Sequence, residues 1–182
     1  MGRTRTAALE GARRVLAEHG LRKATMGDVA VRGGLAKATL YNHFRTKDDL
    51  VAGLVHDDVA ELAADCRDLA TTDLAVALTR AADGVANHPV LVGLRTVEPG
   101  ALLPLAAPGA GEQWDAVRAE VAAILDAGER VSGPSHVDLV LRWLATHVLE
   151  PGTQASREAG ALLVAAGLPA GVRTTAFAVP TA

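Results

Sequence analysis

Four side chains with polar or charged tips lie close together in the stretch LAKATLYNHFRTKDDL, residues 35–50. They are Lys37, Tyr41, Asn42 and His43. An ammonium, a phenol, an amide and an imidazole can each donate hydrogen bonds to anionic oxygen atoms. A helix that only has to pack against its neighbours does not need this set. The stretch therefore indicates contact with a polar, negatively charged partner.

The charge of the chain is unevenly distributed. The 182 residues carry a net charge of −3, but residues 1–55 hold ten Lys and Arg against five Asp and Glu, which is +5. The remaining residues hold eight basic against sixteen acidic side chains, which is −8. A basic segment on an acidic body favours a polyanionic partner for that segment, although charge also varies along chains that have no such partner.

The composition predicts a globular, all-α protein. Hydrophobic residues make up 49% of the chain, charged residues 21% and aromatic residues 3%. The abundant alanine and leucine favour helix, and no run of alternating β-branched and polar residues is present. Cys66 is the single cysteine, which is typical of a reducing compartment. Neither a signal-peptide core nor a membrane-length apolar run occurs, so we expect a cytoplasmic protein without membrane contact.

The basic segment has the pattern of three short helices. Gly20 is placed to end the first helix, Thr25 to cap the second, and Gly33 and Gly34 to separate the second from the third. The expected ranges are residues 4–19, 25–32 and 36–44. Helix, glycine turn, helix is the layout of a helix-turn-helix. The expected core residues are Leu9, Val15, Leu16, Val29, Ala30, Leu35, Leu40 and Phe44.

The third helix would expose a polar face. Leu40 and Phe44 lie about 40° apart at 100° per residue and define its buried side. Ala38, Thr39 and Asn42 lie opposite, flanked by Tyr41 and His43. The second helix of a helix-turn-helix lies in the DNA major groove. There Lys37 can reach guanine acceptors and the methyl groups of Ala38 and Thr39 can meet thymine.

Two positions outside that face are also candidates for phosphate contact. Lys47 stands in the first turn of the next helix, whose free N–H groups attract phosphate. Tyr41 and His43, at the edges of the groove-facing side, suit phosphate oxygens as well. Each of these side chains taken alone could be an ordinary surface residue. Their combination within one basic helix-turn-helix predicts DNA binding.

Residues 6–55 resemble the DNA-binding domain of the TetR family of bacterial transcriptional repressors. The resemblance rests on EHG at the end of the first helix and on ATMGDVAVRGGLAKATLYNHFRTKDDLVAGL, above all on LYNHF-x-x-K-x-x-L. It implies a homodimer that reads a palindromic double-stranded DNA operator. Base contacts would fall on Lys37, Ala38, Thr39 and Asn42, and phosphate contacts on Thr25, Tyr41, His43 and Lys47.

One position departs from the family pattern. Ala36 stands where the family often has serine, which caps the recognition helix and can bond a phosphate. Losing such a cap costs ~1 kcal/mol of helix stability. The departure puts one phosphate contact in doubt but does not affect the expectation of a helix-turn-helix.

The rest of the chain is expected to form a helical body. Helices are predicted over residues 47–69, 73–87, 112–130, 135–149 and 154–166, and a short helix with loops over residues 89–111. The domain boundaries that we expect are 1–50 for the DNA-binding domain, 51–170 for a regulatory and dimerisation domain, and 171–182 for a frayed tail. The helix of residues 47–69 would link the two domains. Cys66 is expected to be a small core residue.

The resemblance further implies a small-molecule pocket in the body and a dimer interface built from the last two long helices. An apolar pocket lined by Leu, Val and Ala is easier to build from this composition than one for a flat cation. The candidate pocket residues are His88, Arg95, Trp114, His136, Trp143 and His147. The candidate interface residues are Val137, Leu141, Leu144, Val148, Ala155, Ala159, Leu162, Leu163 and Ala166. The same helix pair could instead simply complete the monomer core.

The function that we expect is a DNA-binding regulator, a repressor released from its operator by a small-molecule effector. One alternative is a DNA-binding regulator that answers to a protein partner or has no ligand. An enzyme is less favoured because no G-x-S-x-G or H-E-x-x-H motif occurs, and no catalytic, metal or cofactor site is expected. The operator, the effector, the regulated genes and the sign of regulation stay open.

Overall fold

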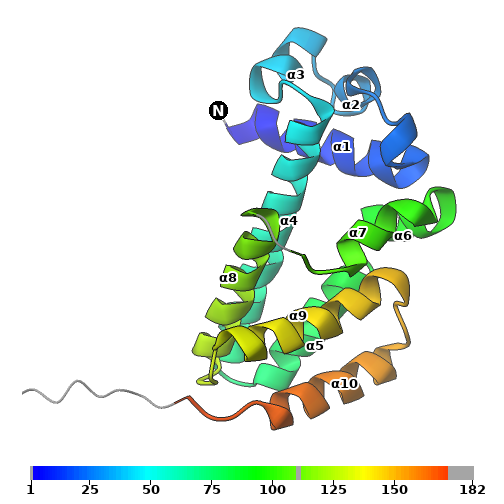
Figure 1. Cartoon of the computed structure of the whole chain (residues 1–182). Helices are drawn as coiled ribbons and strands as arrows, with labels where there is room; N and C mark the ends of the chain where they lie inside the picture. The colour runs from blue at the N-terminus through cyan, green and yellow to red at the C-terminus, as the bar shows by residue number, and fades with distance from the viewer. Residues whose placement is uncertain (1, 110–111, 172–182) are drawn as a thin grey trace, which may run out of the picture.

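The computed structural model describes residues 2–109 and 112–171, and it confirms the all-α class (Figure 1). Within the described ranges the regular elements are helices. They are α1 (Gly2–Lys23), α2 (Met26–Arg32), α3 (Lys37–His43), α4 (Lys47–Ala70), α5 (Leu74–Ala86), α6 (Pro89–Val97), η1 (Pro99–Leu102), α7 (Leu103–Ala106), α8 (Glu112–Ala127), α9 (Pro134–Leu149) and α10 (Gln154–Gly167). An isolated antiparallel bridge joins Arg130 to Ala170.

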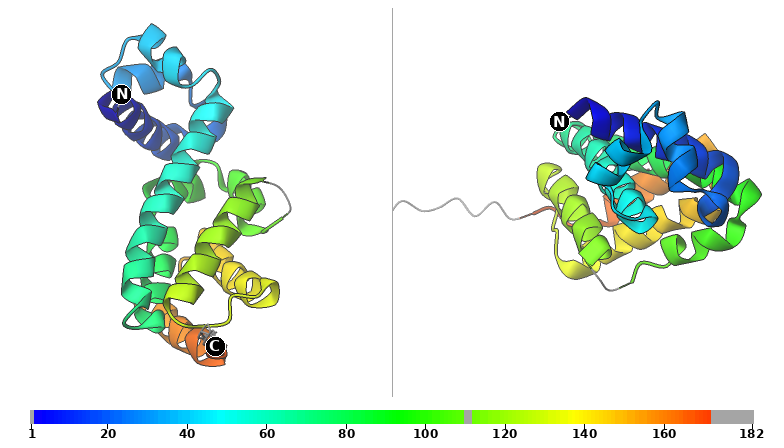
Figure 2. Two further views of the ribbon diagram at one scale, coloured as in Figure 1. Left: turned by 90° about the vertical axis from the view of Figure 1, so that its left-hand side faces the viewer. Right: turned by 90° about the horizontal axis from the view of Figure 1, so that it is seen from above.

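The molecule is long, with α1, α2 and α3 at one end and α10 at the other (Figures 1 and 2). The helix α4 runs from the first end into the body and lies beside α8. None of the described helices is both long and apolar enough to cross a membrane.

Side-chain caps set the start of two helices, and one of them is the predicted cap at Thr25. Thr25 Oγ1 accepts a hydrogen bond from Asp28 N at 3.2 Å and so begins α2. Thr46 and Asp49 form a reciprocal capping box at the start of α4, with N···O distances of 3.0 and 3.1 Å. Each cap bonds a backbone N–H that the first helical turn leaves without a partner.

The helix-turn-helix core is also as predicted. The predicted core side chains are buried, apart from Leu35, which is partly buried and packs against the same cluster. Gly34 takes a φ of +64°, a backbone conformation that glycine adopts without steric cost. This turn separates α2 from α3.

The first helix differs from its prediction at both ends. It begins at Gly2, and helical backbone resumes after Gly20 to end at Lys23. Gly20 itself has a φ of +78° and a ψ of +172°, so the predicted stop is a kink rather than an end. Beyond the kink, Arg22 N donates to Glu98 Oε2 at 2.9 Å, which secures the extra turn to the segment after α6.

The helix α4 contributes to two hydrophobic clusters. Leu50 and Leu54 belong to the cluster around α1–α3, whereas Ala63, Cys66 and Ala70 belong to the cluster of the body. Cys66 is fully buried, as expected of a small core residue. The two ends of one continuous helix are therefore anchored in different cores.

The helix α6 packs against α1, at the helix-turn-helix end of the molecule. Val90 and Leu94 belong to the same buried cluster as α1, and a Cβ atom added to Gly93 would lie 2.1 Å from Ala17 O. Only a glycine permits so close a backbone approach. The packing thus crosses the boundary that we expect at residue 50, which itself stays a prediction.

Two body segments complete the comparison with the predicted ranges. The helix α8 ends at Ala127, earlier than predicted, and Glu129 follows with a φ of +55°. The frayed tail predicted for residues 171–182 lies, apart from Gly171, outside the described residues.

Candidate functional site

The outer face of α3 carries most of the predicted DNA contacts. Lys37, Ala38, Tyr41 and Asn42 are exposed, with 49% of Tyr41 accessible, while Leu40 on the opposite side is fully buried. Thr39 and His43 are half-buried at the edges of the same face. The helix lies at the outer end of the molecule, where a groove could receive it (Figure 1).

Thr25 and Lys47 are already engaged within the chain. The Thr25 hydroxyl donates to Asp28 Oδ2 at 2.6 Å. Lys47 Nζ donates to the carbonyl oxygens of Leu21 at 2.8 Å and Ala24 at 3.3 Å, which fastens the α1–α2 connection to the start of α4. Both side chains therefore position the helix-turn-helix, and their contact with phosphate stays a prediction.

A partly buried carboxylate, with 14% of its side chain exposed, joins three helices beneath the helix-turn-helix. Asp58 on α4 accepts from Arg13 Nη2 of α1 at 2.5 Å and lies 2.8 Å from Nε2 of His88, the residue before α6. An ionised carboxylate only accepts hydrogen bonds, so His88 Nε2 is the donor. Burial alone would raise the pKa of Asp58, but the bonds from His88 and Arg13 outweigh it and hold that pKa below its usual value.

Below this carboxylate lies an apolar cavity of about 440 Å³. It is walled by α4, α5, α6, α8 and α9 and touched by the end of α1. The volume falls within the ~300–1,000 Å³ that is common for small-molecule sites. The lining consists of Leu16, Leu21, Val51, Leu54, Val55, Asp58, Val59, Leu62, Ala63, Cys66, Ala81, Gly84, Val85, His88, Val90, Leu91, Leu94, Ala101, Pro104, Leu105, Trp114, Val117, Glu120, Val121, Ile124, Leu141, Leu144, Ala145 and Val148.

Two of the predicted pocket residues, His88 and Trp114, line this cavity. Arg95 does not, which corrects the prediction. Its guanidinium donates to the carbonyl oxygens of Ala86 at 2.7 Å, His147 at 2.7 Å and Val148 at 2.9 Å. These carbonyls stand at the ends of α5 and α9, where a helix leaves its last acceptors free. Arg95 is thus a clamp between α6 and two helix termini.

His136, Trp143 and His147 do not line the cavity either. The rings of Trp143 and His147 meet edge to face, with centroids 5.1 Å apart. The indole of Trp143 lies on Gly160 of α10, where an added Cβ would stand 2.9 Å from Nε1. The α9 residues were misplaced because helical spacing alone does not tell which neighbouring helix a side chain will meet.

The predicted dimer residues divide into two groups. In α9, Val137, Leu141 and Val148 are buried within the subunit, and Leu144 lines the cavity, so this row is not free to meet a second subunit. The predicted row of α10 is exposed, and its members are Ala155, Ala159, Leu162, Leu163 and Ala166. The reason is that α9 packs against α5, α7 and α8, whereas α10 covers α5 from outside.

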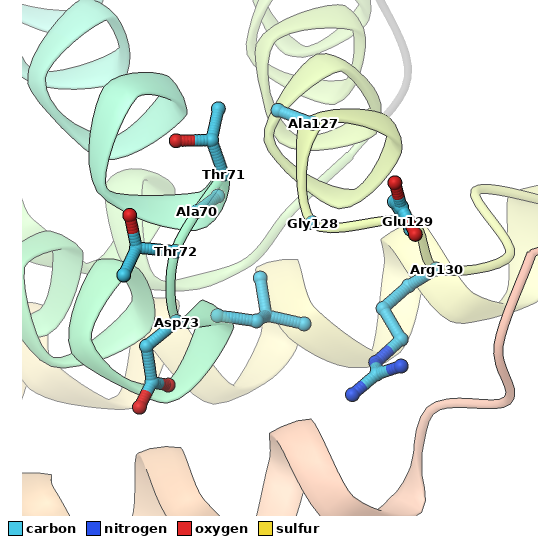
Figure 3. A pocket seen from close by; sticks show the side chains of 9 residues that line it. Ala70, Thr71, Thr72, Asp73, Ala127, Gly128, Glu129 and Arg130 are labelled. Carbon is cyan, nitrogen blue, oxygen red and sulfur yellow. The ribbon is translucent and has the colours of Figure 1, made fainter.

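A second, polar hollow lies at the other end of the body from α3. Figure 3 shows Thr71, Thr72 and Asp73 of the α4–α5 turn on one side, and Glu129 and Arg130 after α8 on the other. Its volume is about 380 Å³. The Asp73 carboxylate is used within the fold, since it accepts from Ala75 N at 2.8 Å and caps α5.

The described residues contain no cluster of three or more His, Cys, Asp or Glu side chains that could hold a metal ion. Burial raises the pKa of the Cys66 thiol to about 11, so this sulfur is protonated at neutral pH.

An exposed basic recognition helix on a helical body defines the class of helix-turn-helix DNA-binding proteins. Residues 8–54 match the family model described as bacterial regulatory proteins, tetR family. The family match therefore lies in the amino-terminal part of the chain, over the helix-turn-helix.

Curated relatives match a similarly short part of the chain. The chain is 39% identical over 56 residues to the HTH-type transcriptional repressor Rv1474c of Mycobacterium tuberculosis, covering 31% of this chain and 30% of the relative. It is 37% identical over 60 residues to the repressor AcnR of Corynebacterium glutamicum, covering 33% and 32%. The matches thus span about a third of the length of these relatives.

Solved structures extend the likeness of fold to the body. The TetR family repressor AlkX from Dietzia sp., implicated in biodegradation of n-alkanes, superposes with a TM-score of 0.65 at 16% identity, covering 89% of this chain and 93% of that one. The regulator FadR from Bacillus subtilis, solved with stearoyl-CoA, gives 0.62 at 13% identity, covering 89% and 98%. The described part of the chain therefore has the fold of these regulators.

Proposed function

We propose that this protein is a DNA-binding transcriptional regulator that acts as a homodimer on a palindromic operator in the cytoplasm. The observation that carries the proposal is the exposed face of α3 on a tetR-type domain. Lys37, Ala38, Tyr41 and Asn42 reach solvent there, while the opposite side of the helix is buried. Two such helices related by a two-fold axis would enter successive major grooves.

We propose that an effector in the apolar cavity controls this binding and releases the repressor from DNA. Support comes from position: the cavity touches α4 and α6, and both helices are fastened to α1. Asp58 bridges α1 to the α5–α6 junction, and Glu98 holds the end of α1. A ligand that favours another placement of α4 or α6 would shift the two recognition helices out of register. The fold neighbours suggest a hydrocarbon-rich effector, since AlkX is implicated in biodegradation of n-alkanes and FadR was solved with stearoyl-CoA.

The experiment that tests DNA recognition is selection from a pool of genomic fragments at several salt concentrations, followed by affinity measurements on the selected site. Tyr41→Phe should weaken binding to all sequences alike, by ~5-fold, since one hydrogen bond to phosphate is lost. Asn42→Ala should lose discrimination at one base pair, worth ~1–3 kcal/mol. Asn87→Ala, a matched change of an exposed asparagine in the body, should leave both unchanged.

Failure of the wild-type protein to select any fragment above bulk DNA would refute the proposal that it is a DNA-binding regulator. If a site is selected but no small molecule in a broad panel raises the melting temperature or weakens binding to it, a regulator without a ligand, or with a protein partner, would replace the effector-controlled one.

A further inference from the structure

The wall of the apolar cavity is poor in groups that could bind an anion. Among its described lining residues there is no Lys or Arg, and no Ser, Thr, Asn, Gln or Tyr. The charged side chains on this wall are two carboxylates, Asp58 and Glu120. Any charge on the wall is therefore negative, apart from what His88 contributes when protonated.

The cations that balance these carboxylates lie outside the lining. Arg13 of α1 forms an ion pair with Asp58 of α4, and Arg67 of α4 forms an ion pair with Glu120 of α8. Neither guanidinium lines the cavity. A ligand anion would thus enter a space in which the one described lining side chain that can become cationic, His88, is already paired with Asp58.

A neutral hydrogen-bond donor meets a better environment. Each oxygen of Asp58 has accepted one hydrogen bond, from Arg13 or from His88, and each retains a further lone pair. A hydroxyl group can use that acceptor without bringing a charge into an apolar space. Burying a ligand carboxylate there would forfeit its hydration without a free cation in replacement, and a ligand ammonium group would have to compete with Arg13 and His88 for Asp58.

We propose that the cavity binds an uncharged, hydrocarbon-rich molecule with a hydrogen-bond donor that reaches Asp58, and that it rejects carboxylates and other anions. The ligand class deepens the proposed function and rests on it for the assumption that this cavity is the effector site. Because Asp58 also bonds Arg13 of α1, the carboxylate that would contact the ligand also connects the cavity to the DNA-binding end.

Tryptophan fluorescence can report occupancy of the cavity without reference to DNA. The chain has two tryptophans, and Trp114 lines the cavity whereas Trp143 does not. A Trp143→Phe variant leaves Trp114 as the sole reporter. Its emission would be titrated with four probes of equal chain length: decanol, decyl methyl ether, ionised decanoate and decylammonium.

Decanol is expected to bind tightest. The ether has no donor and should bind several-fold more weakly, and each ion should bind ~10-fold or more weakly. Asp58→Asn, in the same background, should reduce the preference for decanol over decanoate because one carboxylate is removed while an oxygen acceptor is kept. Val59→Phe would narrow the cavity and should weaken the response, whereas Val76→Phe on the exposed side of α5 should not.

The wild-type ranking decides the proposal even if Asp58→Asn does not fold. Equal or tighter binding of decanoate or decylammonium, equal binding of the ether, or no response to any probe would overturn it. DNA release is measured separately, by displacement of the selected operator. Decanol that fills the cavity without releasing DNA would count against effector control and leave the ligand class standing. Decanoate that fills the cavity and releases DNA would support effector control and overturn the proposed ligand class.

Discussion

His147 is a buried ionisable side chain that the proposed function does not use. It is 6% exposed, and its Nε2 atom is buried without a hydrogen-bond partner among the residues that the structure describes. Burial lowers the pKa of the imidazole below its usual 6.5, and the nearby charge of Arg157 acts in the same direction. The folded protein therefore favours neutral His147 at a pH where the unfolded chain already binds a proton.

This gives a pH dependence of stability with a defined sign. The contribution of neutral His147 is fully present above pH 6.5 and is lost as the pH falls from there toward the lower pKa of the folded state. We expect the wild-type melting temperature to fall over this window and His147→Phe to flatten the fall. The matched change His56→Phe, at an exposed histidine, should retain it. Identical pH profiles for wild type and His147→Phe would contradict the assignment.

The recognition helix α3 begins without a side-chain cap. Ala36 has the extended backbone of an N-cap residue, with φ −67° and ψ 142°, but no side-chain hydrogen bond. Ala36→Ser should therefore stabilise the protein by ~0.5–1 kcal/mol, which corresponds to a rise in melting temperature of ~1–4 °C. Ala64→Ser, an exposed change inside α4, should give no rise because serine is the poorer helix former. An unchanged melting temperature in Ala36→Ser would show that the cap cannot form.

The crossing of α1 and α6 depends on the absence of a side chain at Gly93. An added Cβ would lie 2.1 Å from Ala17 O, so one helix must shift. Gly93→Ala should lower the free energy of unfolding by ~1–3 kcal/mol, measured by urea denaturation, and loosen the link between cavity and DNA-binding end. In contrast, a Cβ at Gly100 meets nothing within 4 Å, and Gly100→Ala should have little effect. Equal free energies of unfolding for the two variants would mean that α1 and α6 lie further apart in solution than in this structure.

For the molecule as a whole, the exposed row of α10 is the surface that we expect to meet a second subunit. Leu162 and Leu163 are 61% and 75% exposed, and exposed leucines beside small residues are costly to leave in water. Leu163→Glu should convert a dimer to a monomer in sedimentation velocity and lower operator affinity by ~100-fold or more, since the two half-sites would no longer be bound together.

The control is Leu103→Glu, which places the same charge on another leucine, 62% exposed, in α7. It should leave both the sedimentation and the affinity unchanged. A Leu163→Glu variant that remains dimeric would move the interface to another face of the body.

Local features of this chain were predictable because they depend on residues a few positions apart. The capping box of Thr46 and Asp49 spans three residues. The core side of α3 follows from helical spacing, which places Leu40 inside and Asn42 outside. The LYNHF motif indicated the family from one short segment, and the family model matches that region.

Relations between distant segments were decided only in the tertiary structure. Asp58 finds its partners 45 and 30 residues away, so nothing beside it in sequence marks it as the junction of three helices. In α9, helical periodicity identified a row of apolar residues but could not tell whether it faces the core or a second subunit. In the structure, packing against α5, α7 and α8 turns that row inward. The sequence could not decide this, because an apolar side chain gains similar burial in the core of a subunit and in an interface between subunits.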